Sequence, residues 1–295
     1  MYINVDFFVC RYAVVTGSNK GIGFETVKQL ASNGITVVLA ARDEKRGLEA
    51  VRNLNELGLS GQVVFHQLNV ADSASIASFA DFVKTQFGKL DILVNNAGML
   101  GVTIDIEAIR ASGGKIDPSR AMIQTYELTE SCLKTNYYGP KTLIESLAPL
   151  LQLSDSPTIV NVSSYYGKLE YITNEWAKEV LGDGDKLTEE RLEEVLSEFR
   201  KDFKDGTLES KGWPTFTAAY KMSKAALIAY TRIAANKYPS FCVNSVCPGF
   251  VKTDFNRNKG TLTVEEGAES LLKLAMLPKG GPSGLFFMRD QVSIF

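Results

Sequence analysis

The feature that most constrains the fold is a regular alternation of short apolar runs with amphipathic stretches between residues 12 and 96. The apolar runs, such as 12–16 and 35–39, are rich in β-branched residues and are too short for helices. The stretch 76–87 instead places apolar side chains at i, i+3, i+4, i+7 and i+11, which indicates a helix with one buried face. Strands that are apolar on both faces and separated by helices form a parallel sheet covered on both sides. The sequence therefore predicts a doubly wound α/β fold.

The pattern continues to the C-terminus without a repeat, a linker or a change of composition. We expect strands at residues 12–16, 35–39, 62–68, 90–94, 158–162, 242–247 and 284–288. One domain over residues 1–295 accommodates them all. Two stretches interrupt the rhythm, an irregular one at 100–122 and an insertion at about 168–214. The insertion carries a stripe of apolar residues from Leu192 to Phe203 at helical spacing, preceded by Thr188 as a helix cap.

Composition excludes several classes of function. Lys and Arg number 32 against 34 Asp and Glu, and this near-neutral balance argues against nucleic acid as a partner. No apolar run approaches the length of about 18 residues that a membrane span needs. The four cysteines are scattered, and no signal peptide is recognisable, so we expect a cytoplasmic protein with reduced thiols. His66 is the only histidine and lies in an expected strand, so we expect a structural histidine and no metal site.

A glycine-rich loop follows the first strand and precedes a helix. It reads Gly17-Ser18-Asn19-Lys20-Gly21-Ile22-Gly23. Glycines at such a turn let a pyrophosphate approach the helix N-terminus, where backbone amides and the helix dipole favour anions. The spacing differs from the common GxGxxG, so on its own the loop could also be a turn without a ligand.

Four further motifs follow in order and make the pattern specific. They are Asn95-Asn96-Ala97-Gly98 after the fourth strand, Ser163-Ser164 after the fifth, Tyr220-Lys-Met-Ser-Lys224 at the start of a helix, and Pro248-Gly249 after the sixth strand. Together with the glycine loop, this set resembles the short-chain dehydrogenase/reductase family from residue 12 to the C-terminus. The insertion before Tyr220 and the phrase Gly212-Trp213-Pro214 resemble the monomeric carbonyl-reductase branch, especially its plant members.

The resemblance implies catalytic roles for four residues. Tyr220 would be the general acid that protonates a carbonyl oxygen, and Lys224 would favour tyrosinate and hold the nicotinamide ribose. Ser164 would orient the substrate oxygen, and Asn136 would support a water relay to the lysine. Taken singly, the same residues could be a surface Tyr/Lys pair, serines that cap a strand end and a solvated asparagine.

The cofactor that the resemblance implies is NADPH. Arg42 stands where NAD-binding folds usually carry an acidic residue. Arg46 lies one turn beyond it and Lys20 lies in the glycine loop, and these basic residues favour a 2′-phosphate. The alternative is that Arg42 and Arg46 form a solvated helix start. The family usually has Asp where this chain has Asn69. The implied cofactor-binding residues are Gly17, Asn19, Lys20, Gly21, Ile22, Gly23, Arg42, Arg46, Asn69, Val70, Asn96, Ala97, Gly98, Tyr220, Lys224, Pro248, Gly249, Val251 and Thr253.

These motifs predict NADPH-dependent reduction of a ketone or aldehyde to an alcohol. The resemblance favours a bulky apolar substrate, such as a terpenoid or alkaloid ketone, flanked by Met99, Leu100, Tyr165 and Tyr166. Two alternatives stay open, reduction of the C=C bond of an enone on the same fold and a catalytically idle NADPH-binding protein. We also expect a monomer, because the apolar stripe of the insertion would cover the helix face through which many relatives of this family assemble.

Overall fold

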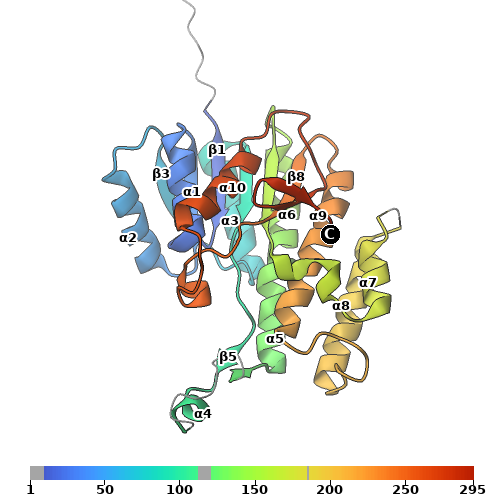
Figure 1. Ribbon diagram of the computed structural model, residues 1–295. Helices are drawn as coiled ribbons and strands as arrows, with labels where there is room; N and C mark the ends of the chain where they lie inside the picture. Colours follow the sequence, from blue (N-terminus) through green and yellow to red (C-terminus); the bar gives the residue numbers. More distant parts are fainter. Residues whose placement is uncertain (1–9, 112–120, 185) are drawn as a thin grey trace, which may run out of the picture.

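The computed structural model describes residues 10–111, 121–184 and 186–295, and its centre is an eight-stranded sheet with helices on both faces (Figure 1). The strand order is β10-β9-β8-β7-β4-β1-β2-β3. The strands are β1 Tyr12–Thr16, β2 Thr36–Ala41, β3 Val63–Gln67, β4 Ile92–Asn95, β7 Thr158–Val162, β8 Cys242–Cys247, β9 Phe286–Met288 and β10 Gln291–Ser293. Every neighbouring pair is parallel except β9 and β10. The doubly wound fold is confirmed.

Two separate layers of apolar side chains lie on the two faces of the sheet. One layer joins the sheet to α1 Gly21–Ser32, α2 Glu44–Asn55 and α10 Val264–Ala275. The other joins it to α3 Ser73–Phe87, α6 Gly139–Leu151 and α9 Ala218–Lys237. On this second face, α5 Tyr126–Leu133 continues into α6 through the π-helix η1 Lys134–Tyr138. A sheet covered on both sides needs strands that are apolar on both faces, which is the pattern in the sequence.

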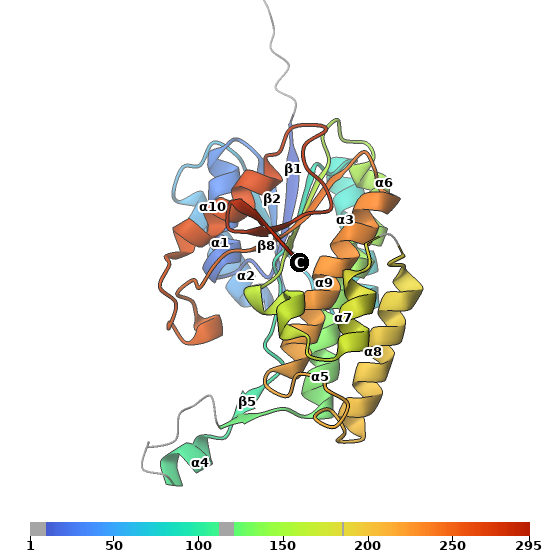
Figure 2. The same cartoon turned by 45° about the vertical axis from the view of Figure 1, so that its right-hand side comes forward.

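Two stretches differ from what the sequence predicts. The chain reverses after β9 and adds β10 as an antiparallel edge strand. A strand of three residues is too short to show a periodic pattern in the sequence. The stretch 100–122 is not wholly irregular. It contains a two-stranded ribbon, β5 Thr103–Ile104 with β6 Met122–Ile123, and the short helix α4 Ile106–Ala111. Both views show β5 and α4 projecting away from the sheet (Figures 1 and 2).

The insertion forms two helices on the outer side of α9 (Figure 2). They are α7 Glu175–Gly182 and α8 Glu189–Lys204, and the Thr188 side chain caps α8 by accepting from the Arg191 amide at 3.3 Å. The predicted apolar stripe is buried. Leu192, Val195, Leu196 and Phe199 are fully inaccessible to solvent, in the same cluster as the apolar residues of α9.

Polar contacts hold the insertion in place as well. Glu193 on α8 accepts hydrogen bonds from the hydroxyls of Tyr137 at 3.1 Å and Tyr138 at 2.7 Å, both on η1. Lys237 at the end of α9 pairs with Glu189 at 3.1 Å and with Glu145 at 3.4 Å. The insertion is therefore an integral layer of the structure.

Some further expectations concern individual groups. His66 is half-buried in β3, with its ring 4.3 Å from that of Phe82 and 5.3 Å from that of Phe79, so its environment is aromatic packing. Within residues 10–111, 121–184 and 186–295, no three His, Cys, Asp or Glu side chains gather as a metal site would require. None of the helices in that part of the chain combines the length and the hydrophobicity of a membrane-spanning segment.

Candidate active site

The parallel strands bring the motifs of the sequence to one edge of the sheet. The glycine loop follows β1, Asn96 follows β4, Ser163 and Ser164 follow β7, and Pro248 follows β8. These strands are neighbours or near neighbours in the sheet, and their carboxyl ends point the same way. Ligands of open α/β sheets bind outside the carboxyl ends of the strands. The residues that the sequence singles out therefore meet at the position where this fold holds a ligand.

The glycine loop leads directly into α1. Gly17 and Gly21 have φ of 62° and 61°, a region that favours glycine, and a Cβ on Gly17 would lie 2.8 Å from the Cα of Ala97. Lys20 begins α1 without a capping hydrogen bond from its side chain, and the first turn carries no acidic residue. The first amides of a helix have no partner within the helix. The start of α1 thus fits an anionic group such as a pyrophosphate.

Asn96 holds the glycine loop from the neighbouring strand. Its amide nitrogen Nδ2 donates to the carbonyl oxygens of Thr16 at 2.8 Å and Gly17 at 3.1 Å. The hydroxyl of Thr16 in turn accepts from the backbone amides of Asn96 and Ala97, both at 3.0 Å. Asn96, predicted to bind cofactor, therefore has its amide group engaged in shaping the loop.

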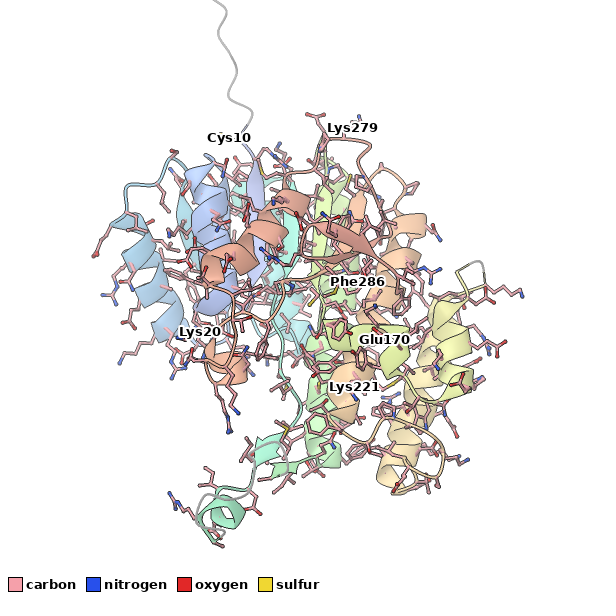
Figure 3. All side chains as sticks on the ribbon, viewed as in Figure 1. Cys10, Lys20, Glu170, Lys221, Lys279 and Phe286 are labelled. Carbon is pink, nitrogen blue, oxygen red and sulfur yellow. The ribbon has the colours of Figure 1, made fainter. Side chains whose placement is uncertain are left out.

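The three basic residues predicted for the 2′-phosphate are all exposed, and two have acidic neighbours. Lys20 pairs with Asp254 at 2.8 Å across the site (Lys20 is labelled in Figure 3), and the guanidinium of Arg46 lies 3.6 Å from the carboxylate of Asp43. Arg42 directly follows β2, and within the described part of the chain no carboxylate pairs with it. Arg42 is the most available of the three for a phosphate.

The predicted cofactor residues that follow β3 and β8 differ in how far they are buried and in what they contact. Asn69 follows β3, and its Oδ1 accepts from the Ala71 amide at 3.2 Å in a local turn. Val70 is buried, with its carbonyl oxygen against Gly139 at the start of α6. After β8, Val251 is also buried, whereas the Thr253 side chain lies close to Gly21 of the glycine loop.

Tyr220, Ser164 and Lys224 lie together at the centre of this edge. Tyr220 and Lys224 are four residues apart on α9 and so share one face of the helix, and the Lys224 ammonium lies 5.8 Å from the centre of the Tyr220 ring. The Tyr220 hydroxyl lies close enough to the side chain of Ser164, which follows β7, for Ser164 to influence the pKa of the phenol. Lys224 Nζ donates to the carbonyl oxygen of Val162 at 2.7 Å. A proton donor, a second hydroxyl and a cation thus meet at one point.

Asn136 lies in the π-helix η1 and is fully buried. Its Oδ1 accepts from the Met99 amide at 2.9 Å, and its Nδ2 donates to the Met99 carbonyl at 2.9 Å and to Ser223 Oγ at 3.0 Å. A Cβ built on Gly98 would lie 3.4 Å from Asn136 Oδ1 and 3.6 Å from Lys224 Nζ. Asn136 is therefore close to Lys224, and the missing side chain at Gly98 keeps the space beside both groups open. Single-turn π-bulges are frequent at functional sites.

Burial is the largest influence on the pKa values of Tyr220 and Lys224. It raises the pKa of the Tyr220 phenol above its usual value, and the side chain of Ser164 opposes only part of the shift. It lowers the pKa of Lys224 to about 8. The expectation that Lys224 favours tyrosinate stays a prediction, and the largest influences on the pKa of Tyr220 are its burial and the side chain of Ser164. Tyr220 carries its proton at neutral pH, as a general acid must.

The residues expected near the substrate divide into two sets. Met99 and Leu100 pack against Tyr220 beside Cys132 and Ala219. Tyr165 and Tyr166 are exposed and join Tyr171 in a cluster whose ring centres are 4.9–6.2 Å apart.

Four residues near the site were missed by the sequence analysis. They are Tyr171, Phe216, Lys221 and Phe255. The ring of Phe255 lies 5.9 Å from that of Tyr220. Tyr165, Tyr166, Tyr171 and Phe216 are named the aromatic rim below. Only the proximity of Lys221 to Tyr220 in sequence could have signalled any of these four residues.

The lowered pKa of Lys224 predicts a pH-dependent stability. A buried lysine costs stability while it is charged, so the cost is present below pH 8 and is relieved as the pH rises from about 8 in the folded protein to about 10.4, where the unfolded chain deprotonates. Replacing Lys224→Met removes this titration. The advantage in unfolding free energy of the variant over the parent should therefore shrink by about 3 kcal/mol between pH 7 and pH 10.4.

Urea unfolding of the cofactor-free protein at these two pH values measures the effect. Lys201→Met, at an exposed position on α8, is the matched control and should give a difference that does not change with pH. Parallel stability curves for Lys224→Met and the parent would contradict the shifted pKa.

Comparisons with known proteins agree with this geometry. Residues 11–175 match the family model described as short chain dehydrogenase. The chain is 59% identical over 290 residues to a (+)-neomenthol dehydrogenase of Arabidopsis thaliana, covering 97% of this chain and 98% of that one. It is 39% identical to carbonyl reductase (NADPH) 3 of Mus musculus, covering 96% and 97%.

A solved structure, salutaridine reductase from Papaver somniferum, superimposes with a TM-score of 0.88 at 54% identity, covering 94% of this chain and 99% of that one. The match to the family model spans more than half of the chain, and these relatives align along nearly its whole length. The chain is therefore an oxidoreductase that belongs to the short-chain dehydrogenase family.

Proposed function

We propose that this protein uses NADPH to reduce a ketone or aldehyde to an alcohol. The observation that carries the proposal is the meeting of Tyr220, Ser164 and Lys224 beside the glycine loop. A protein that only binds a nucleotide has no need of a buried proton donor beside a second hydroxyl. The relatives named dehydrogenase, reductase and carbonyl reductase support the same reaction class.

In this proposal the chain's own groups handle the carbonyl oxygen. Bound NADPH supplies a hydride to the carbonyl carbon. The Ser164 hydroxyl holds the oxygen in place, and Tyr220 donates its phenolic proton to that oxygen as negative charge develops. Lys224 and Asn136 lie behind Tyr220 and return a proton to it from solvent. The net reaction consumes the carbonyl compound, NADPH and one proton, and yields the alcohol and NADP⁺.

The groups around Tyr220 favour a bulky apolar substrate. Met99 and Leu100 form one apolar side, and the exposed rings of Tyr165 and Tyr166 form another. Aromatic rings offer large apolar contact area to ring-shaped compounds. Terpenoid ketones fit this description, and so do alkaloid ketones whose amine is uncharged. A cytoplasmic location stays a prediction of the sequence.

The direct test is NADPH oxidation with saturated ketones, aldehydes and enones, with products identified by gas chromatography. Saturated ketones and aldehydes should give alcohols, and an enone should give the allylic alcohol or nothing, because Tyr220 and Ser164 are placed for oxygen.

Tyr220→Phe removes the proton donor but keeps the ring. Turnover should fall by about 10²–10⁴-fold, the usual share of general acid catalysis, while NADPH binding survives.

The outcomes separate the alternatives. A saturated ketone as the main product from the enone would show reduction of the C=C bond. An absence of turnover across the whole panel, with NADPH bound, would favour an idle binding protein. Near-normal turnover of Tyr220→Phe would remove Tyr220 from the catalytic role.

The preference for NADPH over NADH rests on Arg42. A charge-assisted hydrogen bond is worth about 1.5–3 kcal/mol, and about 1.4 kcal/mol is tenfold in affinity. Arg42→Ala should therefore weaken NADPH binding by at least about tenfold and NADH binding much less. Fluorescence titration with both cofactors measures this, and Arg52→Ala, at an exposed position on the same helix as Arg46, is the control. Equal losses for the two cofactors would show that Arg42 does not contact the 2′-phosphate.

We further propose that the protein is a monomer. The insertion covers the outer side of α9 with Leu192, Val195, Leu196 and Phe199. Glu193 fixes it to η1 by accepting hydrogen bonds from two tyrosine hydroxyls. A second subunit would find this face occupied. Light scattering at micromolar concentration should return the mass of one chain, 32.4 kDa. A dimer or tetramer would contradict the proposal.

A further inference from the structure

A lysine next to Tyr220 in sequence lies among the rings of the aromatic rim. The ammonium of Lys221 lies 6.0 Å from the ring centre of Tyr166 and 5.9 Å from the ring centres of Tyr171 and Phe216. The three rings come from the segment after β7 and from the end of the insertion, and Lys221 joins them from α9. Lys221 is half-buried (it is labelled in Figure 3).

The charge of Lys221 is not compensated by an acidic side chain. In the described part of the chain no carboxylate lies within ion-pair distance of its ammonium, whereas the neighbouring Lys168 pairs with Glu170 at 3.0 Å. Burial lowers the pKa of Lys221, while the faces of the surrounding rings favour its charged form. A cation without a counter-ion in partly dry surroundings acts on other charges more strongly than one in open solvent.

Tyr166 connects this cation to the catalytic centre. Its backbone amide donates to Ser164 Oγ at 3.2 Å, so it lies directly beside the hydroxyl proposed to hold the substrate. Its phenol is also close enough to Tyr220 to influence the pKa of that residue. Tyr166 therefore adjoins Ser164 through its backbone amide and Lys221 through its ring. A charged group on the far end of a substrate that lies over the rim comes close to Lys221.

We propose that Lys221 selects the substrates of this site by charge, disfavouring carbonyl compounds that carry a positive charge and favouring those that are neutral or negative. The inference rests on the proposed function, because it concerns the substrates of the same site. Its basis is the position of one unpaired cation in the rim, 5.9–6.0 Å from three rings of which Tyr166 adjoins Ser164. The rim accepts the apolar body of the substrate, and Lys221 discriminates by what that body carries.

Three benzaldehydes of similar size test the inference. They carry a carboxylate, a methyl ester or a trimethylammonium group at the position opposite the aldehyde. The parent protein should give kcat/KM in the order carboxylate, ester, trimethylammonium, with about tenfold between the first and the last for one partly screened charge. Lys221→Gln should bring the three values together. Lys221→Arg should keep the order, and Lys221→Glu should reverse it.

Ratios between probes separate a charge effect from damage to the adjacent Tyr220, which would lower all three values alike. Lys201→Gln, at an exposed lysine on α8, is the control and should leave the order unchanged. Calorimetric binding of the corresponding carboxylate and trimethylammonium acetophenones without cofactor gives a readout that needs no turnover, and it should show the same preference.

The two proposals fail in different ways. If the methyl ester is not reduced, the proposed function fails, while calorimetry still reports on Lys221. If the parent protein reduces the ester and the trimethylammonium probe equally well, or if Lys221→Gln leaves their ratio unchanged, Lys221 does not select by charge.

Discussion

The site depends on how α9 is fastened to the end of β7. The Lys224 ammonium donates to the carbonyl oxygen of Val162 at 2.7 Å, and Ser163 Oγ donates back to the carbonyl oxygen of Lys224 at 3.0 Å. Gly167 lets the chain run against this part of the helix, because a Cβ there would lie 2.9 Å from the backbone of Lys224. These contacts set the distance between Tyr220 on the helix and Ser164 on the strand end. The position of the phenol relative to the second hydroxyl therefore depends on these contacts.

Burying these polar groups is costly, and the structure offsets the cost by giving them partners. Asn136 has its amide oxygen and nitrogen satisfied by the backbone of Met99 and by Ser223. The same burial raises the pKa of Tyr220 and lowers that of Lys224, so a phenol that keeps its proton lies beside a lysine that can lose one.

The insertion contributes on both of its sides. Its helix α8 buries an apolar stripe against the outer side of α9, and the chain on either side of its helices supplies Tyr171 and Phe216 to the aromatic rim. One segment therefore covers a helix face and lines the approach to the site. This arrangement links the proposed monomeric state to the proposed substrate selection, because both require the insertion to lie where it does.

The fold could be predicted largely from local pattern. The strands β1, β7 and β8 begin and end at the predicted residues, because each run is mostly apolar and almost entirely buried, although β7 contains Asn161 and β8 contains Asn244 and Ser245. Strand β10 could not be predicted from the sequence, since a three-residue edge strand has no periodicity and depends on the neighbour with which it pairs. The ribbon of β5 and β6 is equally short and depends on pairing in the same way.

The sequence by itself determined the doubly wound sheet and the glycine loop, because these follow from local pattern. The resemblance of its ordered motifs to the short-chain dehydrogenase family identified Tyr220, Ser164, Lys224 and Asn136 as candidates. Only the tertiary structure decided the pairing of Lys20 with Asp254, 234 residues away, the engagement of Asn96 with the loop, and the place of Lys221 among rings from the insertion. It also decided that burial is the main influence on the pKa of Tyr220. Such contacts join residues far apart in the chain, and charges act through distance and solvent exposure, neither of which exists until the chain has folded.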